Sequence, residues 1–192
     1  QTIKLVFEWL EKSVKTADPE AREKMHNAST MAGMAFANAF LGMSHSMAHK
    51  IGGVHHTVHG RTNAILLPYV IRYNGTRPSK TTTWPKYNYW KADEKFQDIA
   101  KMLGLPHSTP EEAVEAYAKA VYELGVAVGI KMNFKDQGID EKAWKDSLHE
   151  IALLAYEDQC SPANPRLPMV ADMEEIMADA YYGYAERPGR RK

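Results

Sequence analysis

Helix-start signals, spread along the chain, limit its fold more than any other feature of the sequence. Asp18-Pro19 and Thr109-Pro110 each place a capping side chain directly before a proline in the first helical turn, and Asp140 precedes a further apolar stripe. Thr109 also opens the pattern TPEE, which is typical of a capping box. No segment shows the apolar–polar alternation of a half-buried strand. The sequence therefore predicts an all-α fold, a bundle of several helices.

Apolar residues at helical spacing predict where these helices lie. The predicted helices cover, in chain order, residues 3–10, 19–41, the histidine-rich segment that follows, 61–73, 93–104, 109–128, 140–157 and 169–183. Gly52-Gly53 predicts either a break or a close approach of two backbones. The pattern of residues 76–92 predicts a long loop. This loop is either an interface or a lid, or it is a surface loop held in place by the packing of its tryptophans. We assign residues 1–184 to one helical domain and 185–192 to a basic tail.

The composition excludes several classes of protein. The 192 residues suffice for one sizeable domain, and 24 basic residues balance 24 acidic ones, so charge points neither to nucleic acid nor to an anionic membrane. The most apolar run, Met31 to Met43, is too short to cross a bilayer and contains Asn38, so we predict a buried helix there. The single cysteine, Cys160, cannot form an internal disulfide, which favours a cytoplasmic location.

Five of the eight histidines lie between His45 and His59, whereas the nearest acidic residues are Glu23 and Asp93. His45 and His49 are four residues apart, so on a helix both rings project from one face. His59 lies at the predicted start of the next helix, from which it could reach the same cation. Imidazole suits iron and zinc, but two neutral ligands need a carboxylate from another segment. Spacing alone leaves open whether these histidines share a metal or are incidental.

The other histidines are interpreted as structural. His55 and His56 are adjacent and point to different sides, which favours solvated or core-capping rings. One of them is also a candidate to form a hydrogen bond to a metal-binding residue. His26, His107 and His149 are interpreted as structural or surface residues. The sequence contains no G-x-G-x-x-G or Walker A motif, so it shows no nucleotide-binding unit.

The segment 33–74 and two later segments resemble the iron-dependent (group III) alcohol dehydrogenases. That family's motif G-x-x-H-x-x-x-H-x-x-G is followed by H-G-x-x-N-A-x-L-L-P, and the matching positions here are Gly42, His45, His49, Gly52, His59, Gly60, Asn63, Ala64, Leu66, Leu67 and Pro68. The likeness continues through EDQCSPANPRLP (157–168) and DAYYG (179–183), so it covers almost the whole chain. It resembles above all the alcohol dehydrogenase half of the bifunctional acetaldehyde/alcohol dehydrogenases of fermenting microbes.

The resemblance implies a fold, an activity and residue roles. The fold is that of the C-terminal helical domain of dehydroquinate synthase-like and iron-dependent enzymes, and the activity interconverts acetaldehyde and ethanol with NAD(H). His45 and His59 are implied as ligands of Fe²⁺, with Zn²⁺ as an alternative. His49 is implied as a non-ligating catalytic histidine beside the nicotinamide. Phe36 and Cys160 match positions near the substrate pocket, although a core phenylalanine and a buried thiol are equally good interpretations.

The family's pattern is incomplete in this chain. Its D-A-x-x-H-x-x-E segment, which supplies an Asp and a His to the metal, does not occur, and neither does its nucleotide-binding domain. We therefore expect residues 1–184 to be the metal-binding part of a larger enzyme, inactive alone. The expected partners are that N-terminal domain, a small alcohol or aldehyde, and further copies in an oligomer or filament. Two alternatives stay open, a structural or oligomerisation module and a stand-alone metal-binding bundle.

Overall fold

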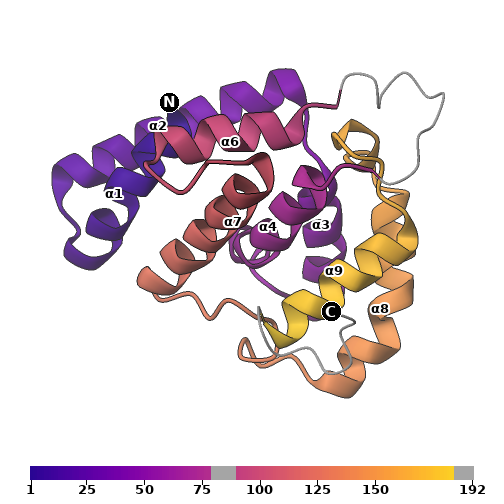
Figure 1. The fold of residues 1–192 in the computed structure, drawn as a ribbon. Coiled ribbons are helices and arrows are strands. Elements are labelled where there is room, and N and C mark those ends of the chain that lie inside the picture. Colours follow the sequence, from indigo (N-terminus) through magenta and orange to yellow (C-terminus); the bar gives the residue numbers. More distant parts are fainter. Residues whose placement is uncertain (79–89, 184–192) are drawn as a thin grey trace.

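The computed structural model describes residues 1–78 and 90–183, and every regular element in these two ranges is helical (Figure 1). The elements are α1 (Thr2–Thr16), α2 (Pro19–Ala39), α3 (Met43–His55), α4 (His59–Gly75), α6 (Ala92–Met102), α7 (Pro110–Ala127), α8 (Glu141–Tyr156), the short 3₁₀ helix η1 (Ser161–Ala163) and α9 (Val170–Tyr182). The all-α prediction is confirmed for these residues. Most of the predicted loop at 76–92, and the predicted tail at 185–192, lie outside them. None of the described helices has the length and apolarity that a bilayer crossing requires.

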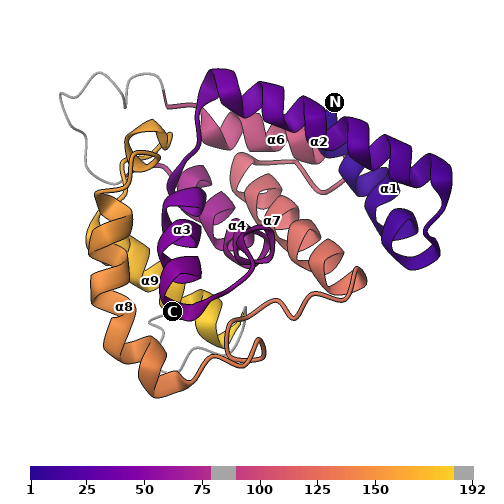
Figure 2. The same ribbon diagram turned by 180° about the vertical axis from the view of Figure 1, so that it is seen from behind.

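The other helices are arranged around α4. It packs on α3, α7 and α9 and touches α6, and it lies in the middle of the molecule when seen from either side (Figures 1 and 2). Leu66 and Tyr69 of α4 belong to a larger apolar core shared with α3, α8 and α9. Ile71 belongs to a smaller core that α7 shares with side chains from α1 and α6. The one helix therefore joins both cores.

The helix starts that were predicted from capping residues are confirmed. Asp18 and Asp140 each accept a backbone N–H of the first turn at 2.9 Å, and Thr109 Oγ1 accepts the N–H of Glu112 at 3.2 Å. The predicted capping box is only half formed, because the Glu112 carboxylate accepts the N–H of Ser108 at 2.7 Å and not that of Thr109. Local side-chain chemistry thus sets these three helix starts.

The double glycine does not break a helix, because α3 runs through both Gly52 and Gly53. Glycine inside a helix costs up to about 1 kcal/mol relative to alanine. Met47 and Ile51 of the same helix are fully buried, and their packing outweighs that cost. The alternative, a close approach of two backbones, is not seen either: a Cβ at Gly52 would lie 3.4 Å from the carbonyl oxygen of Thr57, an ordinary contact, and a Cβ at Gly53 would have no atom within 4 Å.

The apolar run from Met31 to Met43 is not the buried helix that the sequence predicted. Helix α2 ends at Ala39, Phe40 has a φ of 63°, and Met34, Phe36 and Phe40 are 58, 46 and 51% exposed. Among the described helices, α2 packs extensively only on α1, so its C-terminal half has no apolar surface opposite it. An apolar sequence is buried only where the tertiary structure supplies a second surface, and here the described residues supply none.

A buried side-chain amide joins the start of α3 to the end of α4. Asn164 is 1% exposed; its Nδ2 donates to Asn74 Oδ1 at 2.7 Å, and its Oδ1 accepts the N–H of Met43 at 3.2 Å. Gly42 leaves room for this amide, since a Cβ there would lie 2.7 Å from Asn164 Oδ1. Arg166, two residues later, donates to carbonyl oxygens at the C-terminal end of α4. The ANPR segment therefore fixes the two helices that carry the clustered histidines.

Gly42→Ala should destabilise the fold by about 1–3 kcal/mol, because the new methyl group overlaps the buried amide of Asn164. Gly33→Ala is the matched control. Gly33 lies inside α2, no atom lies within 4 Å of an added Cβ, and helix propensity predicts a gain of about 0.5–1 kcal/mol. Urea unfolding followed by circular dichroism measures both. Equal stability of the two variants would contradict the close approach at Gly42.

Candidate functional site

Three histidine rings converge where α3 and α4 meet. His45 and His49 stand one turn apart on α3, with ring centroids separated by 6.2 Å. His59 is the first residue of α4 and follows the turn after α3. The centroid of its ring lies 5.3 Å from those of His45 and His49. The structure thus brings together the three histidines that the sequence singled out, while their roles stay predictions.

His45 and His59 are suited to bind one cation. Burial lowers the pKa of His45, and the charges of His59 and His49 lower it further. The lowered pKa favours the neutral form of His45, whose ring has the lone pair that a metal needs. The 5.3 Å between the two centroids allows one ion, about 2.1 Å from a nitrogen of each ring, to bind both. Because both ligands are neutral, a divalent cation needs negative ligands from another segment.

The ring of His59 contacts Asn63, one turn further along α4. Asn63 Nδ2 lies 3.2 Å from His59 Nε2, and the hydroxyl of Ser44 donates to Asn63 Oδ1 at 2.8 Å. Ser44 lies in the first turn of α3, so this chain of contacts also joins the two histidine-bearing helices. Asn63 belongs to the motif H-G-x-x-N-A in the sequence, and the structure shows that it contacts the first histidine of that motif.

A carboxylate that was not predicted from the sequence lies beside His49. Asp158 follows α8, and its Oδ2 lies 3.2 Å from His49 Nδ1 and 3.0 Å from Lys50 Nζ. The Asp158 side chain is 7% exposed. Burial alone would raise its pKa, but the backbone N–H of Cys160, with Lys50 and His49, outweighs burial and holds the pKa of Asp158 well below its usual range. The one available signal was its position inside EDQCSPANPRLP.

The two predicted pocket residues both lie near the histidines. The ring of Phe36 is 6.4 Å from that of His45, and Phe36 is 46% exposed, so it is not a core phenylalanine. Cys160 is 1% exposed, and burial, with a hydrogen bond to Asp158, raises the pKa of its thiol to about 11. Cys160 is therefore a buried, protonated thiol. A pocket role stays a prediction for both residues.

His49, Asp158 and Cys160 form a second group whose ligand atoms all lie within 4.8 Å of one another. One observation argues against a cation at this group, because the ammonium of Lys50 already lies 3.0 Å from the carboxylate. His45 and His59 are therefore the better candidates for metal ligands, and the second group is a hydrogen-bonded cluster.

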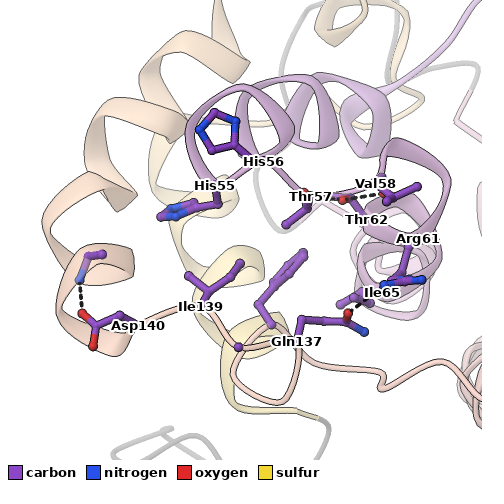
Figure 3. Close-up of a pocket in the computed structure, with 13 residues that line it drawn as sticks. His55, His56, Thr57, Val58, Arg61, Thr62, Ile65, Gln137, Ile139 and Asp140 are labelled. Atoms are coloured by element: carbon purple, nitrogen blue, oxygen red, sulfur yellow. Dashed lines mark hydrogen bonds between the residues drawn. The ribbon is translucent and has the colours of Figure 1, made fainter.

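His55 and His56 lie apart from this site, as the core-capping and solvated interpretations predicted. The ring of His55 stacks on Trp144 with centroids 5.3 Å apart, and its Nε2 lies 3.0 Å from Ser147 Oγ. His56 is exposed and follows the last turn of α3. Both line a separate cleft with a volume of about 300 Å³. The segment before α8 lines the same cleft (Figure 3). The three outlying histidines are exposed, namely His26, His107 and His149.

Comparison with known proteins identifies the family of this chain. Residues 1–181 match the family model described as the Fe-containing alcohol dehydrogenase family, C-terminal. The chain belongs to this family. It is 79% identical over all its 192 residues to the aldehyde-alcohol dehydrogenase of Streptococcus pneumoniae serotype 2 (strain D39), of which it spans 22%. Over 95% of its length it is 38% identical to the bifunctional aldehyde-alcohol dehydrogenase AdhE of Escherichia coli (strain K12), of which it spans 21%.

Solved structures of the family share the fold. A 1,3-propanediol oxidoreductase matches with a TM-score of 0.79 and 33% identity, over 94% of this chain and 43% of that one. An iron-containing alcohol dehydrogenase from Thermococcus thioreducens matches with a TM-score of 0.76 and 35% identity, over 95% of this chain and 43% of that one. The predicted resemblance to the C-terminal helical domain is confirmed. The chain spans about a fifth of the length of the curated aldehyde-alcohol dehydrogenases it matches.

Lys50→Met should lower the free energy of unfolding by about 1–3 kcal/mol at neutral pH, because it leaves the ionised Asp158 without its cation. The folded-state pKa of Asp158 is depressed, so its carboxylate stabilises the fold above the ordinary value of 3.8 and loses this effect as the pH falls below it. The difference between wild type and Lys50→Met should therefore narrow in acid, as urea titrations over a pH series would show.

Lys142→Met is the matched control for that measurement. Lys142 pairs with Asp146 on the surface of α8, where both side chains are mostly exposed, so its loss should leave stability unchanged. An equal loss of stability in the two variants would show that Asp158 behaves as an ordinary surface carboxylate.

Proposed function

We propose that this chain is the metal-binding helical domain of an iron-dependent alcohol dehydrogenase that interconverts a short-chain aldehyde, such as acetaldehyde, and its primary alcohol with NAD(H). The observation that carries the proposal is the convergence of His45, His49 and His59, with the buried Asp158 beside one of them. The family match supports it, as does the name of the relative from S. pneumoniae, an aldehyde-alcohol dehydrogenase.

The residues present fit part of an iron site. His45 and His59 supply two neutral imidazoles, which suit Fe²⁺ and also Zn²⁺. The family description names iron, so iron is the proposed metal. The resemblance implies that the remaining ligands, an Asp and a His, come from a segment outside this chain. When bound, the metal supplies Lewis-acid polarisation of the substrate oxygen, which lowers the pKa of the alcohol.

The side chains of this domain would bind the metal and move a proton. Metal binding at His59 Nε2 would displace the contact with Asn63 Nδ2, because the amide N–H and a metal compete for the same lone pair. The partly exposed ring of Phe36, beside His45, offers an apolar wall that limits substrate size and keeps water from the reacting carbon. His49 accepts the alcohol proton at its Nε2 and passes it to solvent, because imidazole exchanges protons readily near neutral pH.

The nicotinamide would be bound by a separate N-terminal domain. This chain contains no nucleotide-binding motif, and the greater length of its relatives supports the division. The NADPH-dependent butanol dehydrogenase of Clostridium saccharobutylicum, 42% identical over 95% of the chain, keeps NADP(H) as an alternative cofactor. Assembly into an oligomer or filament and a cytoplasmic location complete the proposal. The exposed apolar end of α2 and the single, buried Cys160 support these two points.

A stand-alone metal-binding bundle is the second candidate, because His45 and His59 need only a cation to serve a store or sensor. The contact between His49 and Asp158 favours the enzyme, since storage of a metal requires no anchored histidine beside the ligands.

In the full-length polypeptide, His59→Ala should abolish bound iron, because this domain then supplies only one of its two ligands. His26→Ala, which removes an exposed histidine from α2, should keep the metal. Elemental analysis of the purified variants measures the occupancy. Full iron occupancy in His59→Ala would refute the assignment of His59 as a ligand.

The 192-residue chain alone should not reduce NAD in the presence of ethanol, because part of the metal site and the nucleotide-binding domain are expected on another segment. The full-length polypeptide, assayed by NADH absorbance under the same conditions, is the positive control. Measurable turnover by the purified 192-residue chain would show that this division between domains is wrong.

A further inference from the structure

Asp158 takes no part in the steps proposed above, although it is buried and contacts His49. Its Oδ1 accepts the N–H of Cys160 at 3.0 Å, and its Oδ2 lies 3.0 Å from Lys50 Nζ and 3.2 Å from His49 Nδ1. Lys50 alone would balance the charge of this carboxylate. The additional contact with His49 therefore needs an explanation of its own.

We propose that Asp158 is the positioning residue for His49, which it holds in one orientation and in the tautomer that carries its hydrogen on Nδ1. This inference rests on the proposed function, because His49 matters only if it moves a proton. Lys50 has a supporting part, in that it balances the charge of the buried carboxylate from the neighbouring position on α3.

The chemistry of the carboxylate decides the tautomer. Asp158 stays ionised at neutral pH because its pKa lies well below the usual range, and an ionised carboxylate only accepts hydrogen bonds. His49 Nδ1 must then be the donor, so the neutral ring has its hydrogen on Nδ1 and its lone pair on Nε2. Nε2 is thereby left as the nitrogen that can accept a proton.

The same contact fixes the orientation of the ring. His49 stacks nearly parallel to His59, at an interplanar angle of 16°, and stands edge-on to His45 at 68°. Asp158 is itself held by the Cys160 N–H and by Lys50, so it is a rigid anchor. Because it follows α8, which packs on α3, the anchor is set by the tertiary structure and not by α3 alone. A ring held in this way keeps a constant position beside the two proposed metal ligands.

The chain contains a second contact between a histidine and a carboxylate, which serves as an internal control. His149 Nδ1 lies 2.5 Å from Glu174 Oε1, but the side chain of His149 is 78% exposed. This surface pair lies on α8 and α9, outside the histidine cluster. Glu174→Gln therefore removes a comparable contact without touching the site.

The tautomer of His49 can be measured in the chain without metal or cofactor. Long-range ¹H–¹⁵N correlation spectra of ¹⁵N-histidine-labelled protein distinguish the two tautomers at about pH 8.5, above the ordinary histidine pKa of about 6.5. We expect the Nδ1–H form of His49 in the wild type and in Glu174→Gln. In Asp158→Asn the Nε2–H form should appear, because an asparagine amide can donate to Nδ1. Asp158→Asn/Lys50→Met gives the same readout without an unpaired lysine, should the single variant fold poorly.

In the full-length enzyme, Asp158→Asn should lower kcat by about 10-fold or more, while the KM for the alcohol and the iron content stay unchanged. An unchanged tautomer in both Asp158→Asn variants would overturn the positioning role. A changed tautomer with an unchanged kcat would overturn it equally. A wild-type enzyme that lacks alcohol dehydrogenase activity would instead refute the proposed function. The two failures can be distinguished, because the tautomer of His49 is measured independently of activity.

Discussion

The arrangement of the candidate site depends on one buried amide, that of Asn164. Its two ends bind the start of α3 and the end of α4, and the glycine before α3 lets it come that close. Because an unpaired buried amide is costly, this pairing strongly disfavours any sliding of one helix along the other. The histidines on the two helices therefore meet at fixed distances.

The charges at the site follow from the same packing. The packing of α8 on α3 places Asp158 in contact with both His49 and Lys50. One buried carboxylate thus receives a lysine, a histidine and a backbone N–H, and these contacts outweigh the cost of its burial. Burial, together with the neighbouring rings, instead lowers the pKa of His45. The domain thus places one histidine anchored by a carboxylate next to the two histidines proposed as metal ligands.

The exposed end of α2 fits the position of this chain within its family. Phe36 and Phe40 are both exposed, and the ring of Phe36 lies beside that of His45. The chain spans only 21–22% of the aldehyde-alcohol dehydrogenases it matches. The proposed second domain would bring both the nicotinamide and the remaining metal ligands to this side. An exposed apolar surface beside His45 would suit contact with such a second domain.

The sequence by itself determined the features that depend on neighbours a few residues apart. The capped starts at Asp18, Thr109 and Asp140, the shared face of His45 and His49, and the place of His59 at a helix start all follow from local hydrogen bonding and helical geometry. The carboxylate beside His49 lies 109 residues away in the chain, and the exposure of α2 depends on what packs against it. Only the tertiary structure decided these two features, because burial and long-range pairing are properties of two surfaces that meet and not of either segment alone.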